Sequence, residues 1–300
     1  MFGNDLFVPA ALRLTAALAG GLGLILVAER QHLRDLTKRV LFVRWRTWAI
    51  SAPLFGAAAM GPVELAVVFV MAISFQGMRE YAALVDLPRP YRNAMYAAGL
   101  VSIPIAVLSL TLWRGMPPIL LLAATLTPLL MQDVEQGVRR LAFAAFGFAY
   151  VPWFATYLLL VREHAPGGRS VLLALGMSVA LSDVCAFAAG KLFGRRPLAP
   201  RLSPNKTRAG VLGNVVGAYL GFAIMGFAIP SSVAAGVVWS LPAVIAAGCI
   251  WGDLVESLVK RQFGAKDAGA WLPGFGGLLD RIDSLLVVLP LAYTVLVLWG

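Results

Sequence analysis

The residues best equipped for chemistry lie in residues 257–284, a stretch with four basic residues, three aspartates and five glycines in an otherwise apolar chain. Asp280 and Asp283 are three residues apart and would share one face of a helix that begins there. Gly276 and Gly277 lack a Cβ, so their backbone can approach a ligand closely. Together these groups predict a site for a metal ion and phosphate. An ordinary positive-inside loop would explain the basic residues, but neither the aspartates nor the glycines.

A second polar group of residues comes earlier in the chain. Asp183 lies inside the apolar run 170–192, where a lone carboxylate is costly and therefore needs a partner or a function. The following loop carries Ser203, Lys206 and Thr207 beside prolines, and hydroxyl and ammonium groups suit nucleotide phosphates. For this loop taken alone, attraction of basic residues to anionic lipid is the alternative explanation.

Two more acidic residues, Asp253 and Glu256, are three residues apart at the end of the apolar run 236–258. This spacing places both on one face of a helix, and Glu256 can also pair with Lys260 at i+4.

The composition limits the class of protein. The chain has 300 residues, of which 60% are hydrophobic and 13% charged, so it is not an ordinary soluble domain. Its net charge of +10 is spread over short loops between apolar runs, which excludes a nucleic-acid-binding domain. Cys185 and Cys249 both lie in apolar segments and indicate neither a disulfide framework nor a zinc site.

The apolar runs predict an all-α, polytopic integral membrane protein with about nine to ten transmembrane helices. The first run is too long for a signal-peptide core and has no basic region before it, so we treat it as a membrane helix. The second and third runs meet at Gly61–Pro62 and could form a tight hairpin or one broken element. The ten runs are 7–28, 48–61, 62–78, 94–112, 117–131, 141–161, 170–192, 211–229, 236–258 and 284–299.

The distribution of loop charges predicts the topology. Alternate loops carry nearly all the lysines and arginines, whereas the opposite loops carry only Arg114, Arg162 and Arg169. By the positive-inside rule the charged loops are cytoplasmic and both termini are outside. The two loops that carry the candidate site, 193–210 and 259–283, therefore emerge on the same face.

These residues resemble the signature of the phosphatidate cytidylyltransferases, also called CDP-diacylglycerol synthases. From Ser257 the chain reads S-L-V-K-R, then after four residues K-D-A-G, and after three more P-G-F-G-G-L-L-D-R-I-D. The block from Asp183, which ends in L-A-P-R-L-S-P-N-K-T, and the segment 252–257 extend the similarity. It covers the chain from about residue 170 to the end. The first half agrees only in hydropathy and in Arg79-Glu80-Tyr81.

The resemblance implies an enzyme that joins CTP to phosphatidate and releases pyrophosphate and CDP-diacylglycerol in phospholipid synthesis. It also implies a divalent cation, usually Mg²⁺, with a K⁺ site beside it. The expected catalytic residues are Asp183, Lys206, Lys260, Arg261, Lys266 and Asp267. The expected substrate-binding residues are Ser203, Thr207, Gly274, Gly276, Gly277 and Arg281. The expected metal ligands are Asp183, Asp253, Asp280 and Asp283.

The chain departs from the family pattern at two positions. Phe275 stands where the glycine loop usually has a histidine, and Ala209 stands where the earlier loop usually has a glutamate. A catalytically altered or silent paralogue with another lipid acceptor is therefore one alternative. A CTP-dependent polyprenol-type lipid kinase is another, although the carboxy-terminal block follows the cytidylyltransferase spacing. A transporter is disfavoured because the polar residues crowd into one half of the chain.

We expect two parts in the chain. Residues 1–165 form amino-terminal membrane helices that pack, face lipid and could also form a dimer, and residues 166–300 form the catalytic membrane domain. The expected partners are CTP, phosphatidate or a related lipid phosphate, and membrane lipid, with a homodimer also compatible and no nucleic acid. The expected location is the bacterial inner membrane, with the active site facing the cytoplasm.

Overall fold

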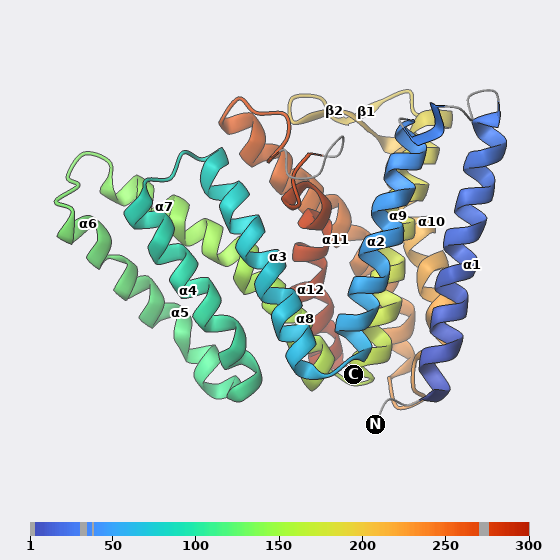
Figure 1. The fold of residues 1–300 in the computed structure, drawn as a ribbon, viewed down its shortest axis with the longest axis horizontal. Helices are drawn as coiled ribbons and strands as arrows, with labels where there is room; N and C mark the ends of the chain where they lie inside the picture. Colours follow the sequence, from blue (N-terminus) through green and yellow to red (C-terminus); the bar gives the residue numbers. More distant parts are fainter. Residues whose placement is uncertain (1–3, 31–34, 38, 270–275, 300) are drawn as a thin grey trace.

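The computed structural model describes residues 4–30, 35–37, 39–269 and 276–299. It is a bundle of long helices that run side by side, with α4, α5 and α6 at one flank and α1 and α10 at the other (Figure 1). The first eight helices are α1 (Asn4–Ala28), α2 (Val40–Met60), α3 (Val63–Leu84), α4 (Arg89–Leu108), α5 (Leu110–Ala124), α6 (Leu126–Leu130), α7 (Gly137–Phe148) and α8 (Phe154–His164). The remaining elements are the π-helix η2 (Ala149–Trp153) between α7 and α8, then α9 (Gly168–Phe193), β1 (Pro197–Ala199), β2 (Ser203–Thr207), α10 (Arg208–Met225), the 3-10 helix η3 (Gly226–Ala228), α11 (Ala235–Gln262) and α12 (Leu279–Trp299).

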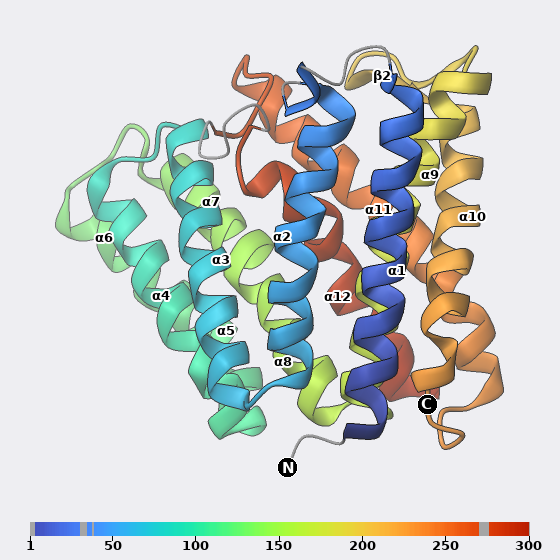
Figure 2. The same ribbon diagram turned by 45° about the vertical axis from the view of Figure 1, so that its right-hand side comes forward.

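The prediction of a helical membrane protein is confirmed. The structure differs from it in having fewer helices that clearly could span a membrane and in containing a short β-hairpin. In the part of the chain that the structure describes, seven helices are long and apolar enough to cross a membrane. They are Val8–Ala28, Leu110–Leu130, Gly137–His164, Gly168–Phe193, Arg208–Ala228, Ala235–Gln262 and Leu279–Trp299. Helices α2, α3 and α4 run beside these spans in both views (Figures 1 and 2). The β-hairpin is antiparallel and consists of β1 and β2.

The two ends of the bundle differ as the loop charges predict. The end of α1, the start of α2, the β1–β2 hairpin and the end of α11 all lie at one end, and the start of α1 and the end of α12 lie at the other (Figure 2). The loops that carry the candidate site therefore emerge on one face of the molecule.

The α2–α3 connection is a tight hairpin rather than one broken helix. α2 ends at Met60, and α3 begins at Val63 after Pro62. The buried Arg162 of α8 donates hydrogen bonds to the carbonyl oxygens of Ala59, at 3.1 Å, and Gly61. These bonds satisfy carbonyls that the end of α2 leaves without a helical partner. Arg162 is therefore part of the architecture at the face opposite the candidate site.

One expected helix boundary is wrong. The apolar run 94–112 reads as a single helix, but α4 ends at Leu108 and α5 begins at Leu110. Ser109 separates them, and its side-chain oxygen accepts a hydrogen bond from the backbone N–H of Leu112 at 3.2 Å. A serine N-cap of this kind starts a new helix inside an apolar run, where hydropathy alone gives no signal.

Helices α9 and α10 form the closest pair in the bundle. A Cβ added at Gly213, Gly217 or Gly221 of α10 would collide with the backbone of α9. Small residues at such spacing let two membrane helices approach closely. The β1–β2 hairpin, which carries Lys206, connects these two closely packed helices.

Outside the spans, Asp133 fastens the α6–α7 connection. Its carboxylate accepts hydrogen bonds from the Tyr91 hydroxyl at 2.7 Å, from Arg140 Nη1 at 2.8 Å and from the Gln136 backbone N–H at 3.2 Å. The Tyr91 hydroxyl, with smaller contributions from Arg140, lowers the pKa of Asp133 below its ordinary value. The connection is therefore held best when this carboxylate is ionised.

Candidate active site

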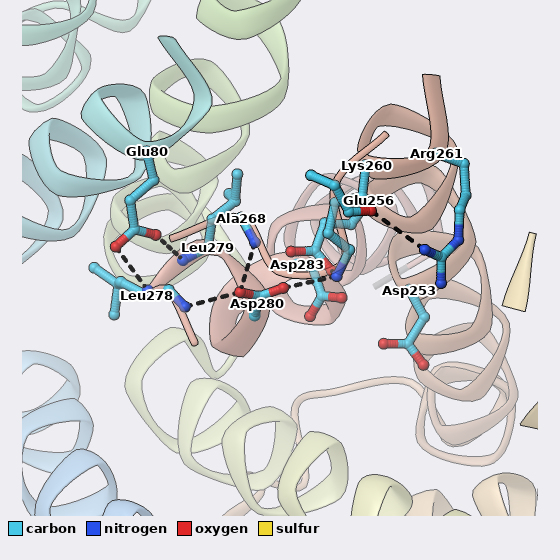
Figure 3. Close-up of polar contacts among 12 residues, drawn as sticks. Glu80, Asp253, Glu256, Lys260, Arg261, Ala268, Leu278, Leu279, Asp280 and Asp283 are labelled. Carbon is cyan, nitrogen blue, oxygen red and sulfur yellow. Dashed lines mark hydrogen bonds and ion pairs between the residues drawn. The ribbon is translucent and has the colours of Figure 1, made fainter. Parts of the chain in front are cut away.

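The carboxylate of Asp280 organises the loop before α12. Asp280 Oδ2 accepts hydrogen bonds from the backbone N–H groups of Ala268, at 3.0 Å, and Gly277, at 2.8 Å (Figure 3). Its Oδ1 lies 2.7 Å from the Lys260 ammonium. Gly276 adopts φ 81°, a conformation that glycine tolerates and that turns the chain back over this carboxylate. Both oxygens of Asp280 are therefore engaged by groups of this chain.

Glu80 holds the same loop from the other half of the chain. Its Oε1 accepts from the Leu278 backbone N–H at 2.9 Å and from Gln76 Nε2 at 2.8 Å, and its Oε2 accepts from the Leu279 backbone N–H at 2.8 Å (Figure 3). Glu80 is only 6% exposed. A Cβ on Gly277 would collide with its carboxylate, so glycine is required for this close approach. Glu80 thus satisfies the unpaired amides at the start of α12 and places a negative charge at the positive end of that helix.

Lys260 bridges two acidic residues. Its ammonium lies 2.7 Å from Glu256 Oε2 on its own helix and 2.7 Å from Asp280 Oδ1 on α12. The i+4 pairing of Glu256 and Lys260 predicted from their spacing is confirmed. The second carboxylate oxygen of Glu256 is buried and has no hydrogen-bond partner in the described part of the chain. The bridge joins α11 to α12 beneath the loop.

An acidic group lies one turn further along α12, where Asp283 is 5% exposed. Its carboxyl interacts with the carboxyls of Asp253, Glu256 and Asp183, and accepts a hydrogen bond from the Ser284 backbone N–H at 2.8 Å. The Ser284 hydroxyl lies 3.4 Å from Asp253 Oδ1. Ser284 therefore contacts the carboxyls of both Asp283 on α12 and Asp253 on α11.

Two ammonium groups reach the acidic group through described ion pairs. Lys206 pairs with Asp253, and Lys260 pairs with Glu256 and Asp280. Among the described residues no three acidic, histidine or cysteine side chains stand in metal-binding geometry. Carboxylate oxygens suit a hard cation by their chemistry, but these side chains would have to turn toward the ion to bind it.

The β1–β2 hairpin brings a cation to the acidic group. Lys206 forms an ion pair with Asp253. Arg261 Nε donates a hydrogen bond to the Leu202 carbonyl at 3.2 Å, which fastens the hairpin to the end of α11. Thr207 Oγ1 accepts from the Gly210 backbone N–H at 3.1 Å and so caps α10. The loop and α11 were expected to share one site, and the structure brings them together.

The other expected site residues lie around this centre or outside the described residues. Lys266, Asp267 and Arg281 are exposed to solvent, and Ser203 is half-buried in β2. Gly274 lies outside the described residues, as does Phe275.

A model of the cytidylyltransferase family matches residues 42–299. The chain belongs to this family. The match includes Glu80 and every candidate residue of the site, and it extends well into the first half, where the sequence resemblance is faint.

Curated relatives match two different lengths of the chain. The phosphatidate cytidylyltransferase of Brucella suis biovar 1 (strain 1330) is 41% identical over 163 residues, 53% of this chain and 59% of the relative. That of Mycobacterium leprae (strain TN) is 38% identical over 167 residues, 55% of this chain and 52% of the relative. The chain thus spans about half the length of these curated relatives. The uncharacterized protein YnbB of Escherichia coli (strain K12) is 29% identical over 261 residues, 84% of this chain and 85% of the relative.

Sequence reasoning named the carboxylates of the acidic group but missed some of the residues that hold them. Nothing in the sequence shows that Glu80 binds amides almost 200 residues later in the chain. Ser284 gave a weak signal as the polar residue directly after Asp283.

Proposed function

We propose that this chain is a membrane-bound cytidylyltransferase that joins CTP to phosphatidate, giving CDP-diacylglycerol and pyrophosphate for phospholipid synthesis. The observation that carries the proposal is a set of carboxylates paired with lysines at the end of the bundle that holds the charged loops. Lys206 pairs with Asp253, and Lys260 pairs with Glu256 and Asp280, beside Asp283. The names of the Brucella and Mycobacterium relatives point to the same reaction.

The chemistry requires two anions to be brought together. A phosphate oxygen of the lipid attacks the α-phosphorus of CTP, and the bond from that phosphorus to the pyrophosphate oxygen breaks. Because the nucleophile is already an anion, the protein needs no general base, and positioning with charge neutralisation supplies most of the catalysis. Lys206 and Lys260 are the cations beside the acidic group and would exchange their carboxylate partners for phosphate oxygens. Arg261, Lys266 and Arg281 extend the positive charge toward the leaving pyrophosphate.

We propose that Asp183, Asp253 and Asp283 hold Mg²⁺, with a K⁺ ion beside it. When bound, the divalent ion neutralises charge on the phosphates and orients them for the displacement. Asp280 is also proposed as a ligand, although it would have to release Lys260 or a backbone amide to serve as one. Asp267, at the edge of the loop, is proposed to orient Lys266.

The proposed setting is the bacterial inner membrane, with the charged loops and the active site on the cytoplasmic side. We propose that α2, α3 and α4 cross the membrane with the seven clearer spans, which gives ten. Residues 166–300 would supply the carboxylates that hold the metal ion and the basic side chains that bind phosphate. Residues 1–165 would pack against them, contribute Glu80 and offer a surface for a homodimer.

The experiment is direct. Purified protein is incubated with labelled CTP, Mg²⁺ and a panel of lipid phosphates in mixed micelles, and CDP-lipid and pyrophosphate are measured. The proposal predicts both products from phosphatidate, and no product without a divalent ion. Absence of CDP-lipid from phosphatidate, with an authentic enzyme active in the same micelles, would contradict it.

A second candidate is a paralogue that uses another lipid acceptor. Two observations favour it: YnbB, which has no assigned activity, matches far more of this chain than the two named relatives do, and Phe275 and Ala209 replace polar residues of the family pattern. The same panel separates the candidates, because a paralogue would form CDP-lipid from a different lipid phosphate. A polyprenol-type kinase would instead release CDP and form no CDP-lipid.

A further inference from the structure

Tyr150 carries a buried hydroxyl that the fold does not use. The residue is 3% exposed, and its hydroxyl has no hydrogen-bond partner in the described part of the chain. The ring is held firmly, stacked on Phe146 with centroids 5.6 Å apart and edge-on to Phe154 at 6.4 Å. A desolvated hydroxyl without a partner destabilises a protein, so its presence needs an explanation.

The turn that carries this hydroxyl lies against the acidic group. Val151, the next residue, packs where Gly77 of α3 faces α12: a Cβ on Gly77 would lie 2.9 Å from Val151 Cγ1 and 3.8 Å from Ile282 Cδ1. The π-helix η2 therefore packs against α3 and the first turn of α12. Ile282 is the residue directly before Asp283 of the acidic group.

The local backbone explains this placement. Residues 149–153 form a π-helical turn inside a long helix, and such turns occur frequently at functional sites because the extra residue changes which side chains face a neighbour. On another side of the same turn, Ala149 and Trp153 line an apolar cavity of about 270 Å³ between α4, α5 and α7. One turn thus presents a polar group to the site and an apolar wall to the cavity.

We propose that the Tyr150 hydroxyl donates a hydrogen bond to a phosphate oxygen of bound substrate, as a binding residue of the proposed cytidylyltransferase reaction. A phenol in this position is a donor that lacks an acceptor. The surrounding carboxylates do not accept from it, and they would attract cations, which in turn bind phosphate. A phosphate oxygen brought in with such a cation would accept the hydrogen bond that the hydroxyl can donate. This inference rests on the proposed function in one respect: the proposed reaction identifies which substrates carry the phosphate.

The oxygen can belong to the lipid phosphate or to CTP. Tyr150 lies within the span Gly137–His164, on the bilayer side of the loops that would receive the nucleotide, so a lipid head group that enters from the bilayer is the source we expect. The two sources are separated by measuring kcat/KM for each substrate while the other is saturating. Loss through a higher KM for phosphatidate indicates the lipid, and loss through a higher KM for CTP indicates the nucleotide.

The test variant is Tyr150→Phe, which removes only the hydroxyl. Its matched control is Tyr157→Phe on α8, whose ring packs on Trp113 and Tyr293 away from the acidic group. A purely structural tyrosine and a phosphate-binding tyrosine predict different results. Removing an unpaired buried hydroxyl should leave the melting temperature of the ligand-free protein unchanged or higher. Losing a bond to a charged phosphate should lower kcat/KM by about tenfold or more.

Three measurements decide the proposal: ligand-free melting temperature, kcat/KM for each substrate, and the rise in melting temperature caused by phosphatidate micelles or by CTP alone. We expect Tyr150→Phe to melt at or above wild type, to lose about tenfold in kcat/KM, and to lose most of the stabilisation by one ligand. The control should match wild type in all three. Activity and ligand stabilisation within about twofold of wild type would overturn the proposal, as would a loss explained by a lower ligand-free melting temperature.

The outcomes also separate this proposal from the proposed function. An active wild type with an unaffected Tyr150→Phe contradicts only the role of Tyr150. A wild type that forms no CDP-lipid, but is stabilised by phosphatidate or CTP in a way that Tyr150→Phe loses, contradicts only the reaction. A wild type that neither reacts nor is stabilised by either ligand contradicts both.

Discussion

The substitution Glu80→Gln tests how the first half of the chain supports the site. In the wild type the two carboxylate oxygens each accept a backbone N–H at the start of α12, from Leu278 at 2.9 Å and Leu279 at 2.8 Å. A glutamine has the same shape but only one acceptor oxygen, so its amide group would face one of these N–H groups. One buried amide would then be unpaired, and the helix would lose its terminal negative charge.

The cost follows from these contacts. An unsatisfied buried amide costs about 1–3 kcal/mol, and loss of a charge at a helix terminus costs roughly 0.3–1 kcal/mol more. We therefore expect the first turn of α12 to lose about 2 kcal/mol of local stability or more. Because about 1.4 kcal/mol corresponds to a factor of ten in an opening equilibrium, its amides should exchange hydrogen at least tenfold faster.

The assay is hydrogen exchange by mass spectrometry on the protein in lipid nanodiscs, read over residues 278–290. Glu64→Gln is the matched control, because Glu64 is an exposed glutamate in the first turn of the same helix, α3. Gly277→Ala should reproduce the Glu80→Gln effect, since its Cβ would push the Glu80 carboxylate away. Exchange at the wild-type rate in both Glu80→Gln and Gly277→Ala would refute the reasoning.

Three further outcomes are expected. Asp283→Asn should reduce CDP-lipid formation by more than tenfold, or about 1.4 kcal/mol in barrier, without loss of expression, and an active variant would remove Asp283 from the site. In a cysteine-free background, single cysteines replacing Ala199 and the exposed Gln262 should be labelled from the cytoplasm and one replacing the exposed His164 from the opposite side. Labelling of the first two from different sides would break the shared site. Because the pKa of Asp133 is lowered in the folded protein, its contribution to stability is present above its unfolded pKa of about 4 and is lost as the pH falls further. Asp133→Asn should therefore melt below wild type at pH 7, and this difference should shrink as the pH drops below 4.

Much of the site could be predicted because local spacing determines it. The i+4 pair Glu256–Lys260 and the shared helix face of Asp280 and Asp283 follow from helical periodicity alone. The charge of the loops placed the hairpin with Lys206 and the end of α11 on one face, where the ion pair of Lys206 with Asp253 then formed.

The rest depends on contacts between distant segments, which one sequence does not encode visibly. Glu80 meets the start of α12 only because α3 packs beside it, and Asp280 of α12 binds Lys260 of α11. The π-helical turn at Tyr150 and the helix break at Ser109 both occur inside apolar runs, where the hydropathy pattern does not indicate the backbone geometry. These are the places where tertiary packing overrides local pattern.

The central claim is that the chain transfers the cytidylyl group of CTP to a lipid phosphate at the acidic group around Asp283. The most direct measurement compares CTP labelled at the α-phosphorus with CTP labelled at the γ-phosphorus, using purified wild type, Asp283→Asn, phosphatidate and Mg²⁺. We predict labelled lipid from α-labelled CTP only, with labelled pyrophosphate from the γ-label, and neither product from Asp283→Asn. Labelled lipid from the γ-label would indicate a kinase, and an Asp283→Asn variant as active as wild type would place the chemistry elsewhere.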